Sequence, residues 1–323
     1  IFDSSNNKVV IAYRDDGNSQ YGTAIVGTVS GTSISFGSPT VFESATVTTV
    51  SATFDSSNNK VVIAYTDDAN SSYGTAIVGT VSGTSISFGS ATVFESAYAN
   101  AVSATFDSNA NKVVIAYADN GNSTYGTAIV GTVSGTSISF GSAAVFESAS
   151  SQYIAATFDS SNNKVVIAYK DEGNSNHGTA IVGTVSSTSI SFGSATVFES
   201  AASDHISATF DSNINKIVIA YEDEGNSDYG TVVVGTVSGT SISFGSAEVF
   251  ESASSNTISA TFDSNANKVV IGYKDAGNSN YGTAVAIAPA GTPEDLTIGQ
   301  QYFVQTDGTL GTSADSPSVI AGT

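Results

Sequence analysis

The sequence is dominated by a unit of 52 residues that recurs with almost no change. The tripeptide Phe-Asp-Ser marks the unit, and its aspartate returns at constant spacing as Asp3, Asp55, Asp107, Asp159, Asp211 and Asp263. A second marker, Ser-Ile-Ser-Phe-Gly, occurs five times in the same register. Self-similarity at a period of about 50 residues is typical of proteins that repeat one supersecondary unit. The structure of one unit can therefore be predicted first, and the whole fold then follows by repeating that unit along the chain.

Each unit carries four strand signals and no helical period. Within residues 50–96 we predict strands at 50–54, 60–65, 74–81 and 85–94, separated by turns rich in Asp, Asn, Ser and Gly. The second of these strands is apolar on both faces, which is typical of a buried middle strand. Four antiparallel strands in about 50 residues are typical of one blade of a β-propeller.

Six such units predict an all-β fold, a six-bladed β-propeller of four-stranded antiparallel blades over residues 1–288. One unit cannot bury both faces of its sheet, so neighbouring units must stack, and a closed ring leaves no exposed end. The first unit lacks its first strand, and the sixth departs from the pattern at Pro289. We therefore predict that the tail, residues 289–323, supplies one or both missing strands or links to a further domain. Its strand signals lie at 296–305 and 317–323.

The composition disfavours several classes of partner. The chain has 29 acidic and only 9 basic residues, for a net charge of −20. Nucleic acids and anionic membrane surfaces need clustered Lys and Arg, so neither is an expected partner. The absence of Cys excludes disulfides and thiolate chemistry, and no apolar run is long enough to predict membrane insertion. The chain opens at Ile1 in mid-unit and has no Met, so we expect it to belong to a longer or processed polypeptide.

The sequence offers little that predicts catalysis. His177 and His205 are the only histidines, and nothing marks one serine as an activated nucleophile. We therefore predict no catalytic residue and expect a protein that is not an enzyme. A glycan-active enzyme remains an alternative. It would need a pocket of convergent acids with perturbed pKa values, which near-identical units build with difficulty.

An aspartate recurs at the turn between the second and third strands of every unit, close to Asn and Ser. Carboxylate and carbonyl oxygens are the ligands that Ca²⁺ prefers, so these turns are candidate calcium sites. The alternative is that each aspartate caps its own turn. No other cofactor is expected. The residues are Asp15, Asp67, Asp119, Asp171, Asp223 and Asp275.

The differences between units are concentrated in two places. One is the connector from the fourth strand to the next first strand, and the other flanks the turn between the second and third strands. In a four-stranded blade both connections emerge on the same face of the disc. Loops on a rigid scaffold often carry binding residues, and Tyr is a common contact residue. Drift at tolerant positions is the alternative. The predicted binding residues are Arg14, Tyr98, Asn100, Gln152, Tyr153, Lys170, His177, Asp204, His205, Glu222 and Lys274.

The amino-acid sequence of the repeat resembles that of a known group of proteins. Asn-Lys-Val-Val-Ile-Ala-Tyr, Tyr-Gly-Thr-Ala-Ile-Val-Gly-Thr-Val-Ser-Gly and Ser-Ile-Ser-Phe-Gly-Ser are similar to repeats of marine bacteriophage tail-fibre and virion structural proteins. The tail segments 299–310 and 317–322 resemble a segment that follows such repeats. This resemblance implies a virion or extracellular module that recognises a host-surface glycan or envelope protein, with other virion proteins as further partners. A purely structural virion or filament protein is the second hypothesis.

Overall fold

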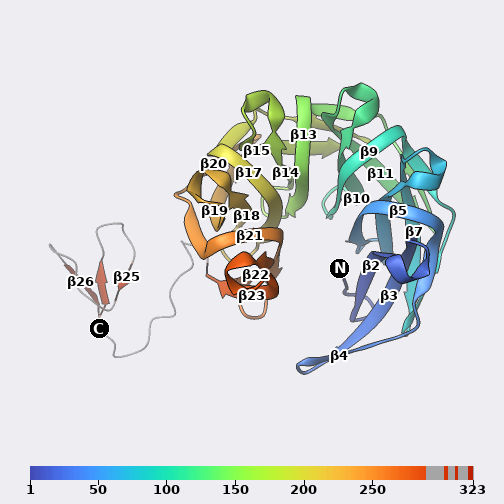
Figure 1. The fold of residues 1–323 in the computed structure, drawn as a ribbon, viewed down its shortest axis with the longest axis horizontal. Coiled ribbons are helices and arrows are strands. Elements are labelled where there is room, and N and C mark those ends of the chain that lie inside the picture. The colour runs from blue at the N-terminus through green and yellow to red at the C-terminus, as the bar shows by residue number, and fades with distance from the viewer. Residues whose placement is uncertain (289–301, 305–309, 312–318, 323) are drawn as a thin grey trace.

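The computed structural model describes residues 1–288 and three short strands of the tail, at 302–304, 310–311 and 319–322. The described chain is all-β, apart from one short 3-10 helical turn in each unit. Antiparallel sheets follow one another around an arc (Figure 1), with sheet β1–β2–β3–β4 at one end and sheet β21–β22–β23 at the other. No described helix has the length and apolar character that a membrane span requires.

The strands of each unit occupy the same places in the repeat. The second strands are β2 (Lys8–Asp15), β6 (Lys60–Asp67), β10 (Lys112–Asp119), β14 (Lys164–Asp171), β18 (Lys216–Asp223) and β22 (Lys268–Asp275). The third strands are β3 (Tyr21–Ser30), β7 (Tyr73–Ser82), β11 (Tyr125–Ser134), β15 (His177–Ser186), β19 (Tyr229–Ser238) and β23 (Tyr281–Ile287). The short fourth strands are β4 (Ser33–Phe36), β8 (Ser85–Phe88), β12 (Ser137–Phe140), β16 (Ser189–Phe192) and β20 (Ser241–Phe244). The 3-10 turns are η1 (Asp16–Asn18), η2 (Asp68–Asn70), η3 (Asn120–Asn122), η4 (Glu172–Asn174), η5 (Glu224–Asn226) and η6 (Ala276–Asn278).

A long strand joins each sheet to the next, and this corrects the predicted loop between the fourth and first strands. We call these 16-residue elements the linking strands. The first half of β9 pairs with β7 of its own unit, and its second half pairs with β10 of the next unit. The predicted fourth strand is therefore two pieces, β8 and the start of β9. The linking strands are β5 (Thr40–Asp55), β9 (Thr92–Asp107), β13 (Ala144–Asp159), β17 (Thr196–Asp211) and β21 (Glu248–Asp263).

Each linking strand contains a β-bulge at the predicted connector. The pairing of β9 with β10 shifts register between Ala116 and Ala118, and Ala101 opposite this shift has a φ of 48°. A positive φ is uncommon for a residue with a side chain, and a bulge redirects the side chains around it. The same position in the other units has positive φ and is occupied by Thr49, Tyr153, His205 and Thr257. The most variable positions of the repeat therefore coincide with a backbone irregularity that sets their direction.

The hydrophobic core lies between consecutive sheets. One face of β6 and β7, carrying Val62 and Ala76, packs on the face of β10 that carries Ile115 and Tyr117. The middle strands are thus covered on both sides, as the apolar sequence of the second strand predicts. Phe94 of β9 lies across this junction, with its ring centroid 5.2 Å from that of Tyr117. Equivalent clusters occupy the other junctions.

A glutamate–tyrosine hydrogen bond accompanies every junction. The Tyr117 hydroxyl donates to the Glu95 carboxylate at 3.1 Å, and Tyr65, Tyr169, Tyr221 and Tyr273 donate in the same way to Glu43, Glu147, Glu199 and Glu251. Burial, with that hydrogen bond and the Glu251 charge adding to it, raises the pKa of Tyr273 to about 12. The glutamate repeated in five units is therefore a structural element of the junctions.

We expect these glutamates to make the protein more stable in mild acid. Burial, and then the charge of a neighbouring aspartate, raises the pKa of Glu43, Glu95 and Glu147 above 4.5. The folded state therefore binds more protons than the unfolded chain between pH 4.5 and the raised values, so the free energy of unfolding increases as the pH falls through that window. His205, whose pKa burial lowers, acts in the opposite direction below 6.5.

Urea unfolding midpoints at about pH 5 and pH 8 measure this dependence. Glu95→Gln is the matched control, because its amide oxygen still accepts from Tyr117 but does not titrate. We expect a smaller difference between the two midpoints in that variant. A midpoint that is equal or lower at pH 5 in the parent protein would contradict the prediction.

The ends of the arc do not join within the described residues. The first sheet has only β1 (Phe2–Asp3) in the place of a first strand, and the sixth has no described fourth strand. In the tail, β24 (Tyr302–Val304), β25 (Leu310–Gly311) and β26 (Val319–Gly322) pair with one another and with no strand of the arc. The tail strands predicted at 296–305 and 317–323 contain β24 and β26, and their remaining residues lie outside the described part. The closed six-bladed ring therefore stays a prediction.

Candidate binding site

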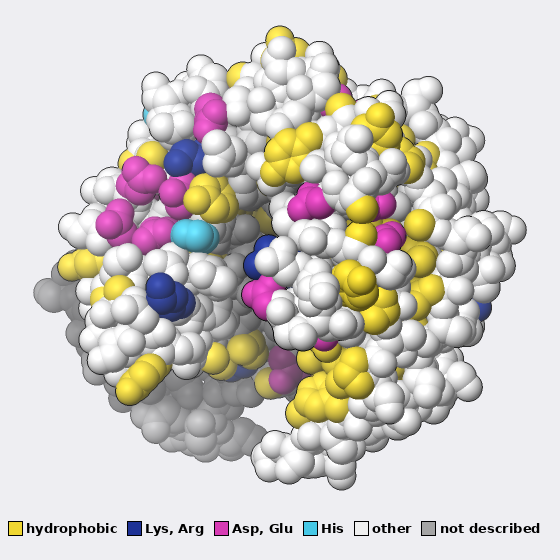
Figure 2. Space-filling view, turned by 45° about the vertical axis from the view of Figure 1, so that its right-hand side comes forward, with side chains coloured by type: hydrophobic (Ala, Val, Ile, Leu, Met, Phe, Trp, Pro, Cys, Tyr) yellow, Lys and Arg dark blue, Asp and Glu magenta, His cyan; other side chains and the backbone are white. Residues whose placement is uncertain are grey.

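Acidic side chains gather around a histidine and a basic side chain on one side of the surface in Figure 2. The side chains in this patch come from two neighbouring units, the fourth and fifth of the chain. The patch contains Gln152, Tyr153, Lys170, Asp204, His205, Glu222 and Glu224, and we call it the junction cluster.

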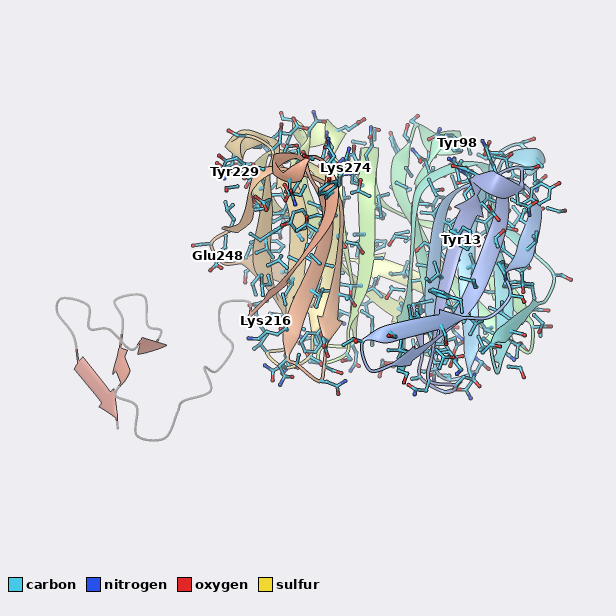
Figure 3. All side chains as sticks on the ribbon, turned by 60° about the horizontal axis from the view of Figure 1, so that its bottom comes forward. Tyr13, Tyr98, Lys216, Tyr229, Glu248 and Lys274 are labelled. Atoms are coloured by element: carbon cyan, nitrogen blue, oxygen red, sulfur yellow. The ribbon has the colours of Figure 1, made fainter. Side chains whose placement is uncertain are left out.

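The junction cluster lies on the face that the sequence comparison singled out. The bulges of the linking strands and the 3-10 turns meet at the same end of every sheet, because Ala99 and Tyr125 both pair with Asp119. Figure 3 shows Tyr98 and Lys274 at this end and Lys216 toward the other. The variable residues of all units therefore share one face.

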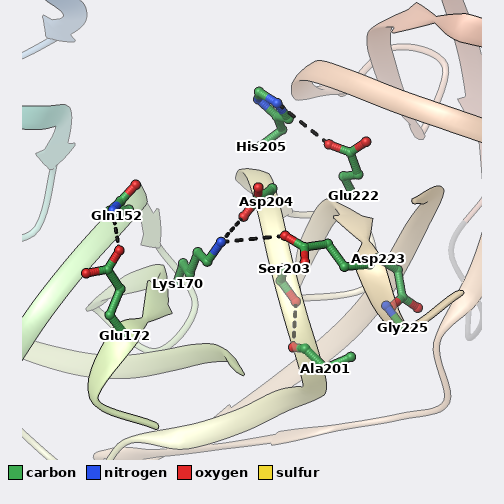
Figure 4. Close-up of polar contacts among 11 residues, drawn as sticks. Gln152, Lys170, Glu172, Ala201, Ser203, Asp204, His205, Glu222, Asp223 and Gly225 are labelled. Carbon is green, nitrogen blue, oxygen red and sulfur yellow. Dashed lines mark hydrogen bonds and ion pairs between the residues drawn. The ribbon is translucent and has the colours of Figure 1, made fainter. Parts of the chain in front are cut away.

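Lys170 is the central charge of the junction cluster (Figure 4). Its ammonium nitrogen lies 2.5 Å from Oδ1 of Asp204 and 3.6 Å from Oε1 of Glu224, both in the next unit. Burial alone lowers the pKa of Lys170, but the hydrogen bond to Asp204 and the charges of Asp204 and Glu224 outweigh burial and raise it. Lys170 is therefore a permanent cation held between carboxylates, with only 13% of its side chain exposed.

Two aromatic rings lie beside this lysine. The ring of Tyr153 is 5.0 Å from that of His205, and the Lys170 ammonium lies 5.8 Å from the Tyr153 centroid. Both rings stand on bulge residues with positive φ, at 48° and 50°. The linking strands β13 and β17 thus place an aromatic pair at the junction, where other units carry Thr or Ala.

Glu222 completes the junction cluster opposite the histidine. Its Oε2 lies 3.6 Å from Nε2 of His205, and its Oε1 accepts a hydrogen bond from Ser254 at 3.0 Å. Burial raises the pKa of Glu222, with the carboxylates of Asp228, Asp204 and Glu224 adding to it, while burial lowers the pKa of His205. At neutral pH the histidine is therefore uncharged, and the site presents carboxylates, one ammonium and two rings.

Among the described residues, the junction between the second and third units lacks such a group of side chains. In the second unit Thr66 takes the place of Lys170, and its hydroxyl donates to the Ala99 carbonyl at 2.6 Å. Thr49 and Ala101 stand at the positions of Tyr153 and His205. The junction between the fourth and fifth units is therefore chemically distinct from the one between the second and third.

The structure brings six of the eleven predicted residues together and leaves five apart. Gln152 lies beside Tyr153 in β13, at the edge of the junction cluster, and its side-chain amide donates a hydrogen bond to Glu172. Among the other five, Arg14 pairs with Asp16 at 2.8 Å, and the Asn100 side chain accepts from the amide of Ala101. Tyr98, His177 and Lys274 lie in other pairs of strands, opposite Tyr73, Asp171 and Asn256.

Sequence reasoning missed three contributors to the cluster. Glu172, Glu224 and Ser254 are not among the predicted binding residues. The signal was present, because Glu172 and Glu224 are the two glutamates in a slot that holds Asp, Asn or Ala elsewhere. What was lacking is the geometry that sets them beside Gln152 and Lys170.

Five of the six turn aspartates cap their own turns. Asp15, Asp67, Asp171, Asp223 and Asp275 each accept a hydrogen bond from a backbone amide of the following 3-10 turn. Asp119 makes no such bond, and its Oδ1 is buried without a partner. Within residues 1–288 no group of three or more acidic or His side chains is placed to hold a metal ion. Calcium binding in these turns stays a hypothesis.

Comparison with known proteins gives a fold and no family. No protein-family model and no curated protein matches the chain. The BP39L lectin from Burkholderia pseudomallei is similar over 90% of this chain and 83% of its own, with a TM-score of 0.63 and 11% identity. AofleA from Arthrobotrys oligospora matches 87% of this chain and 86% of its own, at a TM-score of 0.55 and 10% identity. The chain shares the fold of the BP39L lectin. At this identity the likeness extends to the fold alone.

Proposed function

We propose that the protein is a non-enzymatic carbohydrate-binding module, built on a six-bladed β-propeller, that recognises a glycan through the junction cluster. The observation that carries the proposal is the junction cluster itself, where rings and charged groups from two units converge at one place on a repetitive scaffold. The fold shared with the BP39L lectin supports this function. We further propose that the module acts outside the cell or on a virion and that its target is a host cell surface. This part of the proposal rests on the resemblance of the repeat sequence to phage proteins.

The chemistry of the junction cluster favours neutral glycans. Tyr153 and His205 offer ring faces for the apolar side of a sugar, and Asp204 and Glu222 offer acceptors for its hydroxyl groups. Lys170 is the single cation among the carboxylates, in a protein of net charge −20, so the site repels acidic sugars. Sialylated and sulfated glycans are therefore disfavoured ligands.

A glycan array and a whole-cell binding assay on the full chain test this function. We expect neutral glycans to bind, sialylated or sulfated ones to bind less, and Tyr153→Ala to weaken the affinity by about tenfold, since truncating a ring at a binding hot spot costs more than about 1 kcal/mol. Tyr98→Ala is the matched control, because it removes an exposed ring from the same face outside the junction cluster.

Each contrary outcome has a distinct meaning. Equal losses in Tyr98→Ala and Tyr153→Ala would move the site away from the junction cluster. No binding to any glycan or cell by a folded protein would favour the structural virion or filament protein. Turnover of a bound glycan would favour the enzyme.

A further inference from the structure

The first unit exposes an apolar face that every other unit covers. Ile11 is 41% exposed, whereas Ile63, Ile115 and their counterparts in the later units are fully buried. Ile34 and Phe36 of the same unit are 42% and 48% exposed. In the other units this face is covered by the preceding unit and by its linking strand. The strand edge of β2 beyond β1 is likewise unpaired within residues 1–288.

The fifth and sixth units carry the complementary vacancies. In the first five units a glycine of the third strand lies beneath a phenylalanine ring 20 residues further on, as Gly22 lies beneath Phe42. At the corresponding Gly282, no atom of the described residues lies within 4 Å of the position of a Cβ. Similarly, Gly193 abuts the carbonyl oxygen of Thr240 in the next unit, whereas Gly245 has no such neighbour. Two places that are filled in every earlier unit are thus open at this end.

The sequence of the tail stays in register with the repeat. Counting 52 residues from the preceding unit places Gly291-Thr292 at the Gly-Thr turn before the fourth strand and Tyr302 at the phenylalanine position. Leu310 falls at the position of Ile258, and Asp315 at the aspartate that ends every linking strand. The positions that would fill the two vacancies thus carry the residue types that fill them elsewhere.

We propose that residues 300–312 dock beside the exposed face of the first unit as a sixth linking strand, whose last positions are those already held by Ile1 to Asp3. Tyr302 covers Gly282, Thr292 abuts Gly245, and residues 307–312 pair with the open edge of β2 from Ile11 to Asp15. The pairing follows from the internal junctions, where Thr48 lies opposite Thr66 and Ala52 opposite Ile63. Moving the first residue of each pair five units forward and the second one unit back gives the pairs Gly308 with Arg14 and Thr312 with Ile11.

Docking exchanges one set of strand pairings for a longer one. The tail sheet joins β24 to β25 through two residue pairs and to β26 through three. An internal linking strand pairs along four residues with one sheet and seven with the next, and in the first unit Ile1 to Asp3 already occupy three of those seven places. It also buries the apolar face of the first unit, and burial of apolar side chains is the main favourable contribution to folding. The net gain favours the docked strand over the separate small sheet.

Cysteine pairs test the proposed register, because the natural chain contains no Cys. In the full chain, Arg14→Cys with Gly308→Cys is expected to form an intramolecular disulfide under mild oxidation. Thr48→Cys with Thr66→Cys is the positive control, since those residues are paired in the structure. Arg14→Cys with Gly291→Cys is the negative control, because the register places these residues at opposite ends of the strands. Free thiols or disulfide-linked dimers in the first pair, with the positive control oxidised, would overturn the proposal.

A glycine pair gives a second test that needs no cross-link. Gly230→Ala forces a methyl group against the ring of Phe250 and is expected to lower Tm by several degrees. If Tyr302 covers Gly282, Gly282→Ala lowers Tm by a similar amount. An unchanged Tm in Gly282→Ala, beside a lowered one in Gly230→Ala, would contradict the docking. Both tests are independent of glycan binding.

Discussion

Phe94→Ala is expected to destabilise the protein by about 3–5 kcal/mol, the range found when a buried aromatic side chain is removed from a core. Phe94 is 7% exposed, and its ring lies 5.2 Å from Tyr117 and 5.8 Å from Phe140, both in the next unit. The substitution removes the aromatic contact between two sheets and leaves a cavity at their junction. The strand positions around it are held by backbone pairing, so the cavity collapses only in part.

Urea unfolding of the full chain, followed by circular dichroism, measures this loss. Val93→Ala is the control, because Val93 precedes Phe94 in the same strand but points outward and is 40% exposed. Its expected cost is below about 0.5 kcal/mol. Equal effects of the two substitutions would show that the junction is held by something other than the aromatic contact.

Gly141→Ala is expected to cost about 3 kcal/mol, at the upper end of the range for overpacking. A Cβ at this position would overlap the carbonyl oxygen of Thr188, which belongs to the turn of the next unit. Because the overlapping atom belongs to the backbone, it cannot be relieved by a change of side-chain rotamer. The two sheets would have to separate locally, at a junction that depends on close packing.

Gly135→Ser is the matched control for this substitution. Gly135 lies in the preceding turn with a φ of 63°, and a Cβ there would meet no atom within 4 Å. Ser187 occupies the same position in the fourth unit with a φ of 57°, so the fold already accepts a serine there. Thermal unfolding of both variants compares Gly141, where there is no room for a side chain, with Gly135, where glycine serves only to adopt a positive φ. A larger loss in Gly135→Ser would contradict the packing argument.

The fold within one unit could be predicted well from the sequence, but its connections could not. The second strand is apolar on both faces and the third begins at a repeated Tyr-Gly, so β6 and β7 lie within one residue or two of their predicted bounds. The linking strand was divided into two strands and a loop. Its bulge interrupts the alternation of apolar and polar residues, and the bulge residues vary from unit to unit. Because such a strand changes its partner sheet midway, its sequence does not show one continuous alternation of apolar and polar residues.

The junction cluster was predictable in part. Comparison of equivalent positions identified Tyr153, Lys170 and His205, because each differs from its counterparts in the other units. The same comparison also identified Arg14 and Lys274, which belong to the first and sixth units and so lie outside the junction between the fourth and fifth. Only residues of adjacent units can meet, and that condition comes from the arrangement of the sheets. Pairs such as Lys170 and Asp204, 34 residues apart, need that arrangement before they can be recognised.

The linking strands have a consequence for how the molecule opens. In a stack of repeats that touch only through their faces, one unit can open while its neighbours stay folded. Here each linking strand hydrogen-bonds to two sheets at once, so a sheet that detaches removes a strand from the sheet beside it. Local opening must therefore spread to the neighbouring sheet or close again. We therefore expect the near-identical units to unfold together, with local fraying only at the two ends of the arc.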